Sequence, residues 1–329
     1  MTRSPIPTQR DATSAHFFSS APFAFSAVKL PLMKSGFCVL WGRPNVGKST
    51  LLNALLGRKH VIVSPRPQTT RHRITGVLHS GDGEGENDYQ IVFLDTPGIH
   101  EPQHKLGETL VKTARGALQD IECVVFVADT TDKPHDDDRR AAALLEGVRA
   151  PVLLGLNKTD AAQELSTRKA QFEALRRFDA TLEISALQEK GLDELKAAIV
   201  ERLPEGDPYF PIDMIGDRSP EFHIEELIRE QAMLQLREEV PHAVAVNIEA
   251  MEPRRNNTLF IEAFINIERE SQKRIVIGAG GSRIKEIGQK ARAEIETLLG
   301  RSVYLELRVK VRDKWRENDL WIKRLGYGD

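Results

Sequence analysis

The chain has 329 residues, which is too many for one small core and typical of about two domains. Its apolar fraction of 40% and charged fraction of 29% are ordinary globular values that exclude a disordered or fibrous chain, and no apolar run reaches the roughly 18 residues of a membrane-spanning helix. The net charge of −2 gives no sign of a polyanionic partner for the chain taken as a whole.

Residues 1–35 differ in composition from the rest of the chain. They are rich in serine and proline, contain one acid, Asp11, and show neither helical nor strand periodicity, so we expect disorder there. Their acid-poor composition also fits a mitochondrial or plastid targeting segment. Because Met33 stands directly before the first predicted strand, a start codon assigned too far upstream explains the segment equally well. The sequence leaves these explanations open.

A phosphate-binding loop comes after the first predicted strand. The apolar run 36–41 leads into the GxxxxGKS motif of residues 42–49, and residues 50–56 then have helical spacing. In such a loop the glycines let backbone amides approach phosphate, Lys48 supplies positive charge, and Ser49 ligates Mg²⁺ at the start of the helix. A chance match would lack the flanking strand and helix. The predicted nucleotide-binding residues here are Gly42, Arg43, Pro44, Asn45, Val46, Gly47, Lys48, Ser49 and Thr50.

A second predicted strand, 91–94, ends in the tetrapeptide Asp95, Thr96, Pro97 and Gly98. An acid at a strand end suits a partner of Mg²⁺, and Gly98 is free to turn its N–H towards a γ-phosphate. The acidic, glycine-rich segment 80–87 lies between the predicted strands 74–78 and 89–94. It lacks the ligand spacing of a calcium loop, so we interpret it as the exposed turn of a hairpin.

A third predicted strand, 152–156, precedes the tetrapeptide 157–160 (NKTD, of the pattern NKxD), whose residues Asn157, Lys158 and Asp160 decide the base. One carboxylate can accept hydrogen bonds from both N1–H and the exocyclic amine of guanine, whereas adenine would leave that charge unpaired. This tetrapeptide therefore predicts GTP and GDP rather than ATP. Ser185 and Ala186, beyond a short strand at 182–184, fit a loop whose amide meets guanine O6, although such a pair is also an ordinary helix cap.

These four strand-end motifs, in this order, resemble the translation-factor-like GTPases, and the segment 68–72 (QTTRH) is similar to switch I of the Era subfamily. The resemblance implies that Thr70, or else Thr69, reaches Mg²⁺ beside Ser49 and Asp95, and that Lys48, Asn45, Thr70 and Gly98 carry catalysis. Ile99 stands where Ras-like enzymes have the glutamine that orients water, so we expect slow intrinsic hydrolysis. In some relatives an asparagine like Asn45 helps to hold K⁺ near the phosphates, which makes K⁺ a second candidate cofactor.

The remaining chain predicts a second domain. A linker with three prolines, 203–211, comes after the predicted helix 192–202, and then come a helix around residues 224–234, strands at 244–249 and 259–268, a GxxG loop at 278–281, a helix at 282–299 and a strand at 303–311. The fold class is therefore α/β: a mostly parallel sheet with helices on both faces, then an α+β domain. The predicted domains are an extension 1–35, a GTPase domain 36–203, a linker 204–220 and a C-terminal domain 221–325.

The C-terminal domain resembles a type II KH domain, in which a glycine loop brings the backbone close to about four nucleotides of single-stranded RNA. Residues 269–316 hold thirteen Lys or Arg against six acids, which fits an RNA-binding module but also a solvated helix face. The resemblance makes 275–277 the end of a short helix, although periodicity favours a strand. The middle of the loop lacks the usual cation. The predicted RNA-binding residues are Gly278, Ala279, Gly280, Gly281, Arg274, Arg283 and Lys285.

A GTPase domain joined to a KH domain resembles the Era family of ribosome-associated GTPases. This resemblance implies a monomeric, cytoplasmic GTPase that binds the 3′ end of small-subunit ribosomal RNA, acts in assembly of the small ribosomal subunit, and has some peripheral contact with the inner membrane. The alternative is a GTPase whose C-terminal domain binds a protein or another RNA, such as a tRNA-modification GTPase. Cys38 and Cys123, in apolar strand-like runs, are predicted to be buried free thiols.

Overall fold

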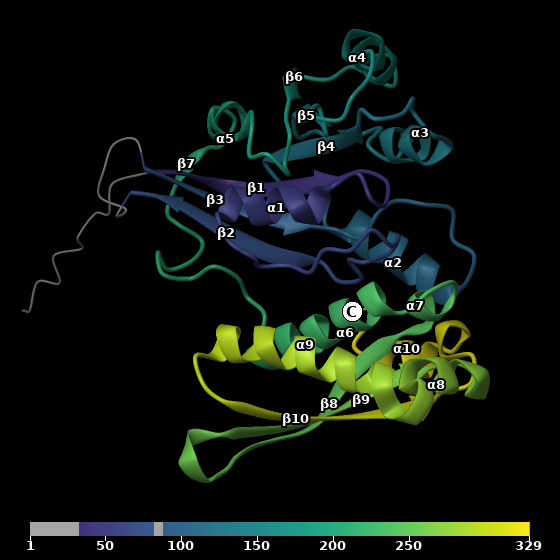
Figure 1. The fold of residues 1–329 in the computed structure, drawn as a ribbon. Helices are drawn as coiled ribbons and strands as arrows, with labels where there is room; N and C mark the ends of the chain where they lie inside the picture. Colours follow the sequence, from purple (N-terminus) through teal and green to yellow (C-terminus); the bar gives the residue numbers. More distant parts are fainter. Residues whose placement is uncertain (1–32, 82–87, 329) are drawn as a thin grey trace, which may run out of the picture. The chain divides into compact units, whose positions relative to one another are not determined.

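The computed structural model describes residues 33–81 and 88–328, which belong to one compact unit of the chain. The predicted extension therefore lies outside the described residues apart from its last three positions, as does most of the predicted hairpin turn at 80–87. In the described part, two sheets are formed in chain order, one from each predicted domain (Figure 1).

The first sheet has the strand order β2-β3-β1-β4-β5-β6, with β7 paired to β1. All pairs are parallel except β2 with β3 and β7 with β1, as predicted for a mostly parallel sheet. Its strands are β1 (Met33–Trp41), β2 (Ile74–Ser80), β3 (Tyr89–Asp95), β4 (Cys123–Asp129), β5 (Val152–Asn157), β6 (Ala180–Glu183) and β7 (Glu205–Gly206).

Helices cover both faces of this sheet, because its central strands are apolar on both sides. Cys38 and Leu40 of β1 face one core together with leucines of the first and last helices, whereas Val39 and Trp41 face the other. Cys38 and Cys123 lie opposite each other on β1 and β4 as buried free thiols, which confirms that prediction. The helices are α1 (Lys48–Leu56), α2 (Lys105–Gly116), α3 (Asp136–Ala143), α4 (Leu165–Glu173) and α5 (Leu192–Val200).

The predicted linker is held against the first domain. The side chain of Gln90 on β3 accepts hydrogen bonds from the backbone N–H groups of Tyr209 and Phe210 and donates to the Phe210 carbonyl. The N–H of Val77 on β2 donates to the carbonyl of Ile215 over 2.7 Å. The segment between the domains therefore runs along the edge of the sheet up to the next helix.

The second domain has a three-stranded sheet of order β10-β9-β8, in which β9 and β10 are parallel and β8 is antiparallel to β9. Residues 275–277 end a helix, as the resemblance implied and against the strand periodicity. The elements are α6 (Pro220–Gln235), α7 (Val240–Ala243), β8 (Ala245–Pro253), β9 (Leu259–Ile267), α8 (Glu270–Ile277), α9 (Ser282–Leu299), β10 (Val303–Val311) and α10 (Asp319–Arg324), with short 3₁₀ turns at Arg255–Asn257, Ala279–Gly281 and Trp315–Glu317.

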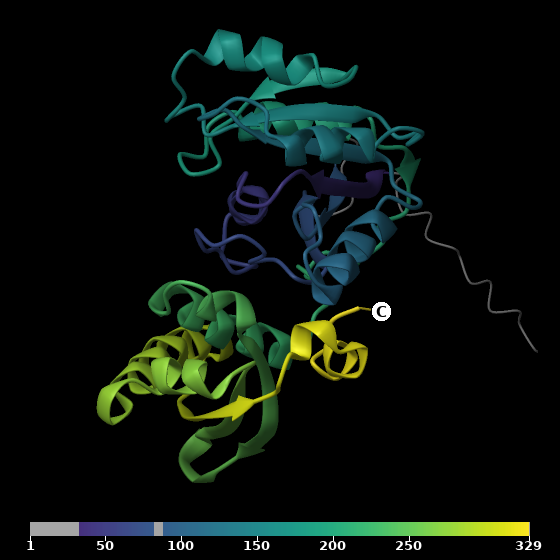
Figure 2. The same cartoon turned by 90° about the vertical axis from the view of Figure 1, so that its right-hand side faces the viewer.

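Helices α6 and α9 lie side by side on one face of this sheet, as Figures 1 and 2 show from two directions. The alternation along β9 explains why, since Ile261, Ala263 and Ile265 point into the apolar core shared with these helices. A further apolar cluster joins the two domains, because Leu106 and Leu110 of α2 pack with residues of the C-terminal segment such as Trp315 and Tyr327. No helix in the described part of the chain is long and apolar enough to cross a membrane.

Candidate nucleotide and RNA sites

The phosphate loop wraps around the side chain of Lys48. Its ammonium group donates to the carbonyl oxygens of Gly42 and Arg43 over 3.0 and 2.9 Å, and burial lowers the pKa of Lys48 to about 8. Gly47 has a φ of 99°, and a Cβ there would lie 2.4 Å from the Asn157 amide, so only glycine fits. The loop is therefore shaped to hold an anion beside a buried cation at the N-terminus of α1.

Three predicted Mg²⁺ ligands meet beside this loop. The Ser49 hydroxyl lies 2.7 Å from the Thr70 hydroxyl and donates to Asp95 Oδ2 over 2.7 Å, and Thr70 donates to the same oxygen over 3.3 Å. Asp95 Oδ1 is buried without a partner, and burial raises the pKa of Asp95 above its usual value although Lys48 opposes the shift. An orphaned carboxylate oxygen beside two hydroxyls fits a divalent cation.

The geometry also separates the two threonines of switch I. The Thr69 hydroxyl is 2.7 Å from that of Ser64 and donates to the Arg66 carbonyl over 2.7 Å, so it is engaged within its own loop. Thr70 alone of the pair is placed beside Ser49 and Asp95.

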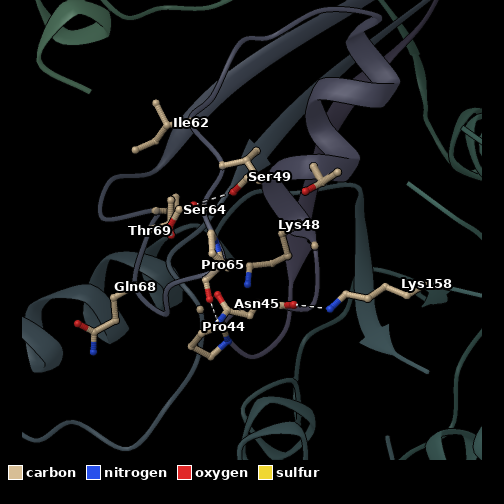
Figure 3. A pocket seen from close by; sticks show the side chains of 15 residues that line it. Pro44, Asn45, Lys48, Ser49, Ile62, Ser64, Pro65, Gln68, Thr69 and Lys158 are labelled. Atoms are coloured by element: carbon tan, nitrogen blue, oxygen red, sulfur yellow. Dashed lines mark hydrogen bonds between the residues drawn. The ribbon is translucent and has the colours of Figure 1, made fainter. Parts of the chain in front are cut away.

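Asn157, Lys158 and Asp160 connect the phosphate loop to the predicted base-contacting loop at residues 185–186. The Asn157 amide donates to the Val46 carbonyl over 2.8 Å and accepts from the Ala186 N–H over 3.0 Å. Lys158 donates to the Asn45 carbonyl over 2.9 Å, as Figure 3 shows. The Ser185 hydroxyl donates to Asp160 Oδ1 over 2.5 Å. Asp160 is exposed, so its second oxygen is open to a base.

A cavity of about 350 Å³ marks the phosphate end of the site. It is lined by the phosphate loop, residues 62–65 and 68–70, Gly98 and Lys158 (Figure 3). Gly98 approaches the phosphate loop so closely that a Cβ would lie 2.5 Å from the Pro44 nitrogen. Several predicted residues do not line this cavity; they are Gly42, Arg43, Val46, Asp95, Thr96, Pro97, Asn157, Asp160, Ser185 and Ala186.

Three of the predicted residues have structural partners in this geometry. Arg43 forms ion pairs with Asp138 over 3.0 Å and with Asp129 over 3.6 Å instead of facing the cavity. The Thr96 hydroxyl donates to the Leu40 carbonyl over 2.9 Å. The Asn45 amide donates to the Pro65 carbonyl over 3.1 Å and thereby connects the phosphate loop to the segment just before switch I.

Ile99 cannot orient an attacking water, because its side chain is fully buried in the core next to the loop formed by residues 95–98. The next residue, His100, connects this loop to switch I. Its Nδ1 lies 3.0 Å from the Gly98 carbonyl and its Nε2 lies 2.9 Å from the Gln68 amide nitrogen. Since a carbonyl only accepts, Nδ1 carries the proton and Gln68 donates to Nε2 in the neutral ring.

Two buried arginines connect switch I to the second domain, and local sequence patterns do not indicate these contacts. Arg71 is buried and donates to the carbonyls of Val244 and His242 over 2.6 and 3.0 Å. Arg229 of α6 donates to the Thr69 carbonyl over 2.5 Å while paired with Glu226. Arg71 and Val244 are 173 positions apart in the chain and Thr69 and Arg229 are 160 apart, so no short motif contains both partners.

The GxxG loop has the backbone that its glycines predict. Gly278, Gly280 and Gly281 have φ values of 73°, 58° and 80°. A Cβ on Gly278 would lie 2.7 Å from that of Arg283, whereas Gly280 and Gly281 face open space. The loop is therefore packed at its first glycine and open at the others, as a loop that approaches a ligand requires.

A groove of about 400 Å³ lies between α9 and the edge strand β10. Lys285, a predicted RNA-binding residue, lines it, and Arg274 is exposed on α8. Arg283 is half-buried and donates to the Gln235 carbonyl, so part of its guanidinium group is used within the protein. The other lining residues were not predicted, although an exposed tyrosine on the polar face of a strand was a usable signal; they are Ile284, Gly288, Gln289, Arg292, Tyr304, Leu305, Glu306 and Leu307.

Comparison with known proteins covers both domains. The family model of the 50S ribosome-binding GTPase matches residues 37–158, and that of the KH domain matches residues 239–316. Two curated relatives named GTPase Era, from Carboxydothermus hydrogenoformans and Clostridium botulinum, are each 45% identical to this chain. The alignments cover 89% and 90% of this chain and 98% and 99% of the relatives.

Solved structures agree with these relatives. A variant of Aquifex aeolicus Era bound to GDP and aluminium fluoride is 40% identical, with a TM-score of 0.84, over 90% of this chain and 100% of that one. Era in complex with MgGDPNP and nucleotides 1506–1542 of 16S ribosomal RNA is 39% identical, with the same TM-score and the same coverage.

Proposed function

The chain belongs to the Era family of GTPases, and from this membership and its two sites we propose that it is a GTP-hydrolysing switch that binds the 3′ end of small-subunit ribosomal RNA. Its role is then in assembly of the small ribosomal subunit, in the cytoplasm. The observation that carries the nucleotide half is the group formed by Ser49, Thr70 and the orphaned Asp95 oxygen beside the phosphate loop. The observation that carries the RNA half is the groove beside the GxxG loop.

In this proposal Lys48 and the amides of the phosphate loop hold the phosphates, and Asp160 selects guanine. Mg²⁺, when bound by Ser49, Thr70 and Asp95, supplies positive charge to the phosphate oxygens. Gly98 directs its N–H towards the γ-phosphate. Because Ile99 is buried and apolar, no side chain at that position orients water, and the intrinsic rate is slow.

Potassium is part of the proposal through Asn45. This residue has a φ of 63° and lines the phosphate cavity, and its amide donates to the carbonyl of Pro65, just before switch I. Its side-chain oxygen and nearby loop carbonyls are hard oxygen ligands, which suit an alkali cation beside phosphate. Such a cation would compensate for the charge stabilisation that an arginine finger gives to other GTPases.

In this proposal the bound nucleotide affects the RNA site through switch I. Thr70 stays beside Mg²⁺ only while the γ-phosphate holds the loop, and Thr69 is bound by Arg229 of α6. Helix α6 packs against α9, whose residues line the RNA groove. Release of switch I on hydrolysis therefore changes a contact that supports this groove, and RNA affinity depends on the bound nucleotide.

The test measures binding of a single-stranded RNA with the sequence of the ribosomal 3′ end, with GDP or a non-hydrolysable GTP analogue bound. Ala279→Asp with Gly280→Asp places two carboxylates in the exposed half of the GxxG loop. Open space around Gly280 avoids a steric clash, and aspartate is one of the residues that tolerate a left-handed backbone. We expect this pair to abolish RNA binding and to leave GTP turnover nearly unchanged.

The matched control is Ala143→Asp with Gly147→Asp in the GTPase domain. These positions are exposed, and Gly147 also has a positive φ and open space around it, so the control adds the same charge at the same backbone cost. This control should bind RNA normally. Equal RNA affinity with both nucleotides would refute the coupling, and retained affinity in the loop variant would refute the RNA site.

A further inference from the structure

An aspartate at the end of β4 contacts both segments that are predicted to hold the nucleotide. Asp129 is buried, and its Oδ2 accepts from the Lys158 ammonium group over 2.6 Å and lies 3.6 Å from the Arg43 guanidinium. Arg43 belongs to the phosphate loop, and Lys158 belongs to the NKxD tetrapeptide. Asp129 lies outside both motifs, so no short sequence pattern assigns it a role.

The side chain of Lys158 crosses the nucleotide site. Its backbone lies two residues before Asp160, the predicted partner of the base, and its ammonium group donates to the Asn45 carbonyl of the phosphate loop over 2.9 Å (Figure 3). Lys158 also lines the cavity at the phosphate end. A nucleoside held between Asp160 and the phosphate loop therefore lies against the aliphatic stem of this lysine, because the stem spans the distance between the two ends of the site.

The Asp129 carboxylate is itself held in place and charged. Its Oδ1 accepts from the N–H and the hydroxyl of Thr131 over 3.1 and 2.6 Å. Burial would raise the pKa of Asp129, but hydrogen bonds from Lys158 and Thr131 hold it below its usual value. The next residue, Thr130, donates through its N–H and its hydroxyl to the Asn157 carbonyl over 3.0 and 2.8 Å. The end of β4 is therefore a fixed anchor for the flexible lysine that follows β5.

Lys158 depends on this anchor more than Arg43 does. Without the Asp129 charge, the Asn45 carbonyl is the remaining acceptor of the Lys158 ammonium group among the described residues. Lys158 is half-buried, so its ammonium group can then turn out into water and its stem can leave the nucleoside. Arg43, in contrast, donates to Asp138 over the shorter distance of 3.0 Å and keeps that partner.

From these contacts we propose that Asp129 is a positioning residue that sets how long a guanine nucleotide stays bound, by holding Lys158 against the nucleoside. The inference rests on the proposed function, because that function places the base at Asp160. GDP and GTP share the nucleoside, so Asp129 slows the release of both to the same extent. Its effect differs from that of the Mg²⁺ ligands, which distinguish nucleotides by the γ-phosphate.

The experiment measures the rate at which fluorescent GDP, or a fluorescent non-hydrolysable GTP analogue, leaves the full chain when unlabelled nucleotide is added in excess. Asp129→Asn keeps the size of the side chain and an oxygen for Thr131 but removes the charge that holds Lys158. We expect both nucleotides to dissociate about tenfold faster. Preference for guanine over xanthine should persist, because Asp160 is unchanged. A dissociation rate belongs to folded, occupied molecules, so a loss of stability alone lowers the signal amplitude and leaves the rate as it was.

The matched control is Asp132→Asn, the same substitution three positions further along the chain. Asp132 is exposed and pairs with His135 over 3.1 Å rather than with a nucleotide-binding residue. This control should release both nucleotides at the parent's rate. Equal acceleration in the control would show a general effect of lost charge and overturn the proposal. So would an unchanged rate in Asp129→Asn, or a change for one nucleotide alone.

A double-mutant cycle tests whether Asp129 acts through Lys158. Lys158→Met keeps an unbranched stem without the ammonium group and should also speed release. Combining it with Asp129→Asn should give no further acceleration, because the second change removes a partner that is already lost. Independent effects of the two changes would show that Asp129 acts through another residue and would overturn the proposal. If the parent chain bound no guanine nucleotide, the proposed function would fail as well, whereas unaltered release from Asp129→Asn refutes the positioning role alone.

Discussion

The buried pair Arg229 and Glu226 offers the sharpest test of how the second domain controls switch I. Arg229 donates to both Glu226 oxygens over 2.7 and 2.5 Å and to the Thr69 carbonyl over 2.5 Å, and both side chains are buried. Burial alone would raise the pKa of Glu226, but the Arg229 guanidinium holds it below its usual value. The pair therefore stays ionised, and the Arg229 guanidinium binds both the Glu226 carboxylate and the Thr69 carbonyl of switch I.

The substitution Arg229→Leu leaves Glu226 as a buried carboxylate without its partner. Breaking a buried ion pair in this way costs about 3–5 kcal/mol of the free energy of unfolding. Replacing both members, Glu226→Leu with Arg229→Leu, removes the unpaired charge and should recover most of that loss, to within about 1 kcal/mol of the parent. Both variants lose the hydrogen bond to Thr69, which as a charged-donor bond is worth about 1.5 kcal/mol or more.

Two measurements distinguish these variants. Guanidinium denaturation should show the single variant strongly destabilised and the double variant nearly as stable as the parent. Fluorescent nucleotide binding should show both variants about tenfold weaker for a GTP analogue with Mg²⁺, because about 1.4 kcal/mol is a factor of ten, and unchanged for GDP. If the double variant kept the parent's preference for the GTP analogue, the contact between Arg229 and Thr69 would have no role in the switch.

Three further predictions concern the base, the pH dependence and the monovalent cation. Asp160→Asn should move nucleotide preference from guanine towards xanthine in competition binding, because an amide can donate to the xanthine O2, and unchanged GTP selectivity would contradict the assignment. Burial raises the pKa of Glu225 to about 7, so the stability this group contributes is complete below about pH 4.3 and lost as the pH rises through 7. After allowance for the partial exposure of Glu225, this contribution to the free energy of unfolding is about 1 kcal/mol. The variant Glu225→Gln can still accept from the Ile248 N–H, and its melting temperature should vary less between pH 5 and pH 8 than that of the parent. A plot of melting temperature against pH that runs parallel to the parent's would contradict this reasoning. GTP turnover should be faster in K⁺ than in Na⁺ at equal ionic strength and should lose this difference in Asn45→Ala, whereas equal rates in the parent would remove potassium from the proposal.

The local parts of both sites could be predicted because the residues of each part are close together in the sequence. A glycine loop between a strand and a helix has few alternative geometries, so the positions of Lys48 and Ser49 follow from the motif itself. The same holds for α9 and β10, whose predicted ranges of 282–299 and 303–311 match the structure, because their periodicity and flanking glycines are strong local signals. The position of Asp95 beside the phosphate loop follows from the rule that parallel strands end at one edge of the sheet, and that of Thr70 from the resemblance of switch I.

Other features depend on residues that the chain brings together only on folding. Nothing near Arg71 in the sequence indicates that it is buried against the carbonyls of Val244 and His242, and nothing near Arg229 indicates the Thr69 carbonyl. The pairing of Lys158 with Asp129 is also a tertiary property, because a lysine has a carboxylate partner only if folding places one within reach.

The sequence by itself thus determined the chemistry of each site, the nucleotide, the metal and the class of RNA-binding domain, because short-range motifs fix the donors and acceptors within a few residues. The tertiary structure decided how the sites are connected and which charges are paired, because contacts between distant segments depend on how the apolar faces of two domains pack. The physical reason is that local backbone geometry is set by steric rules along the chain, whereas the burial and pairing of a charge are set by whatever surface folding places against it.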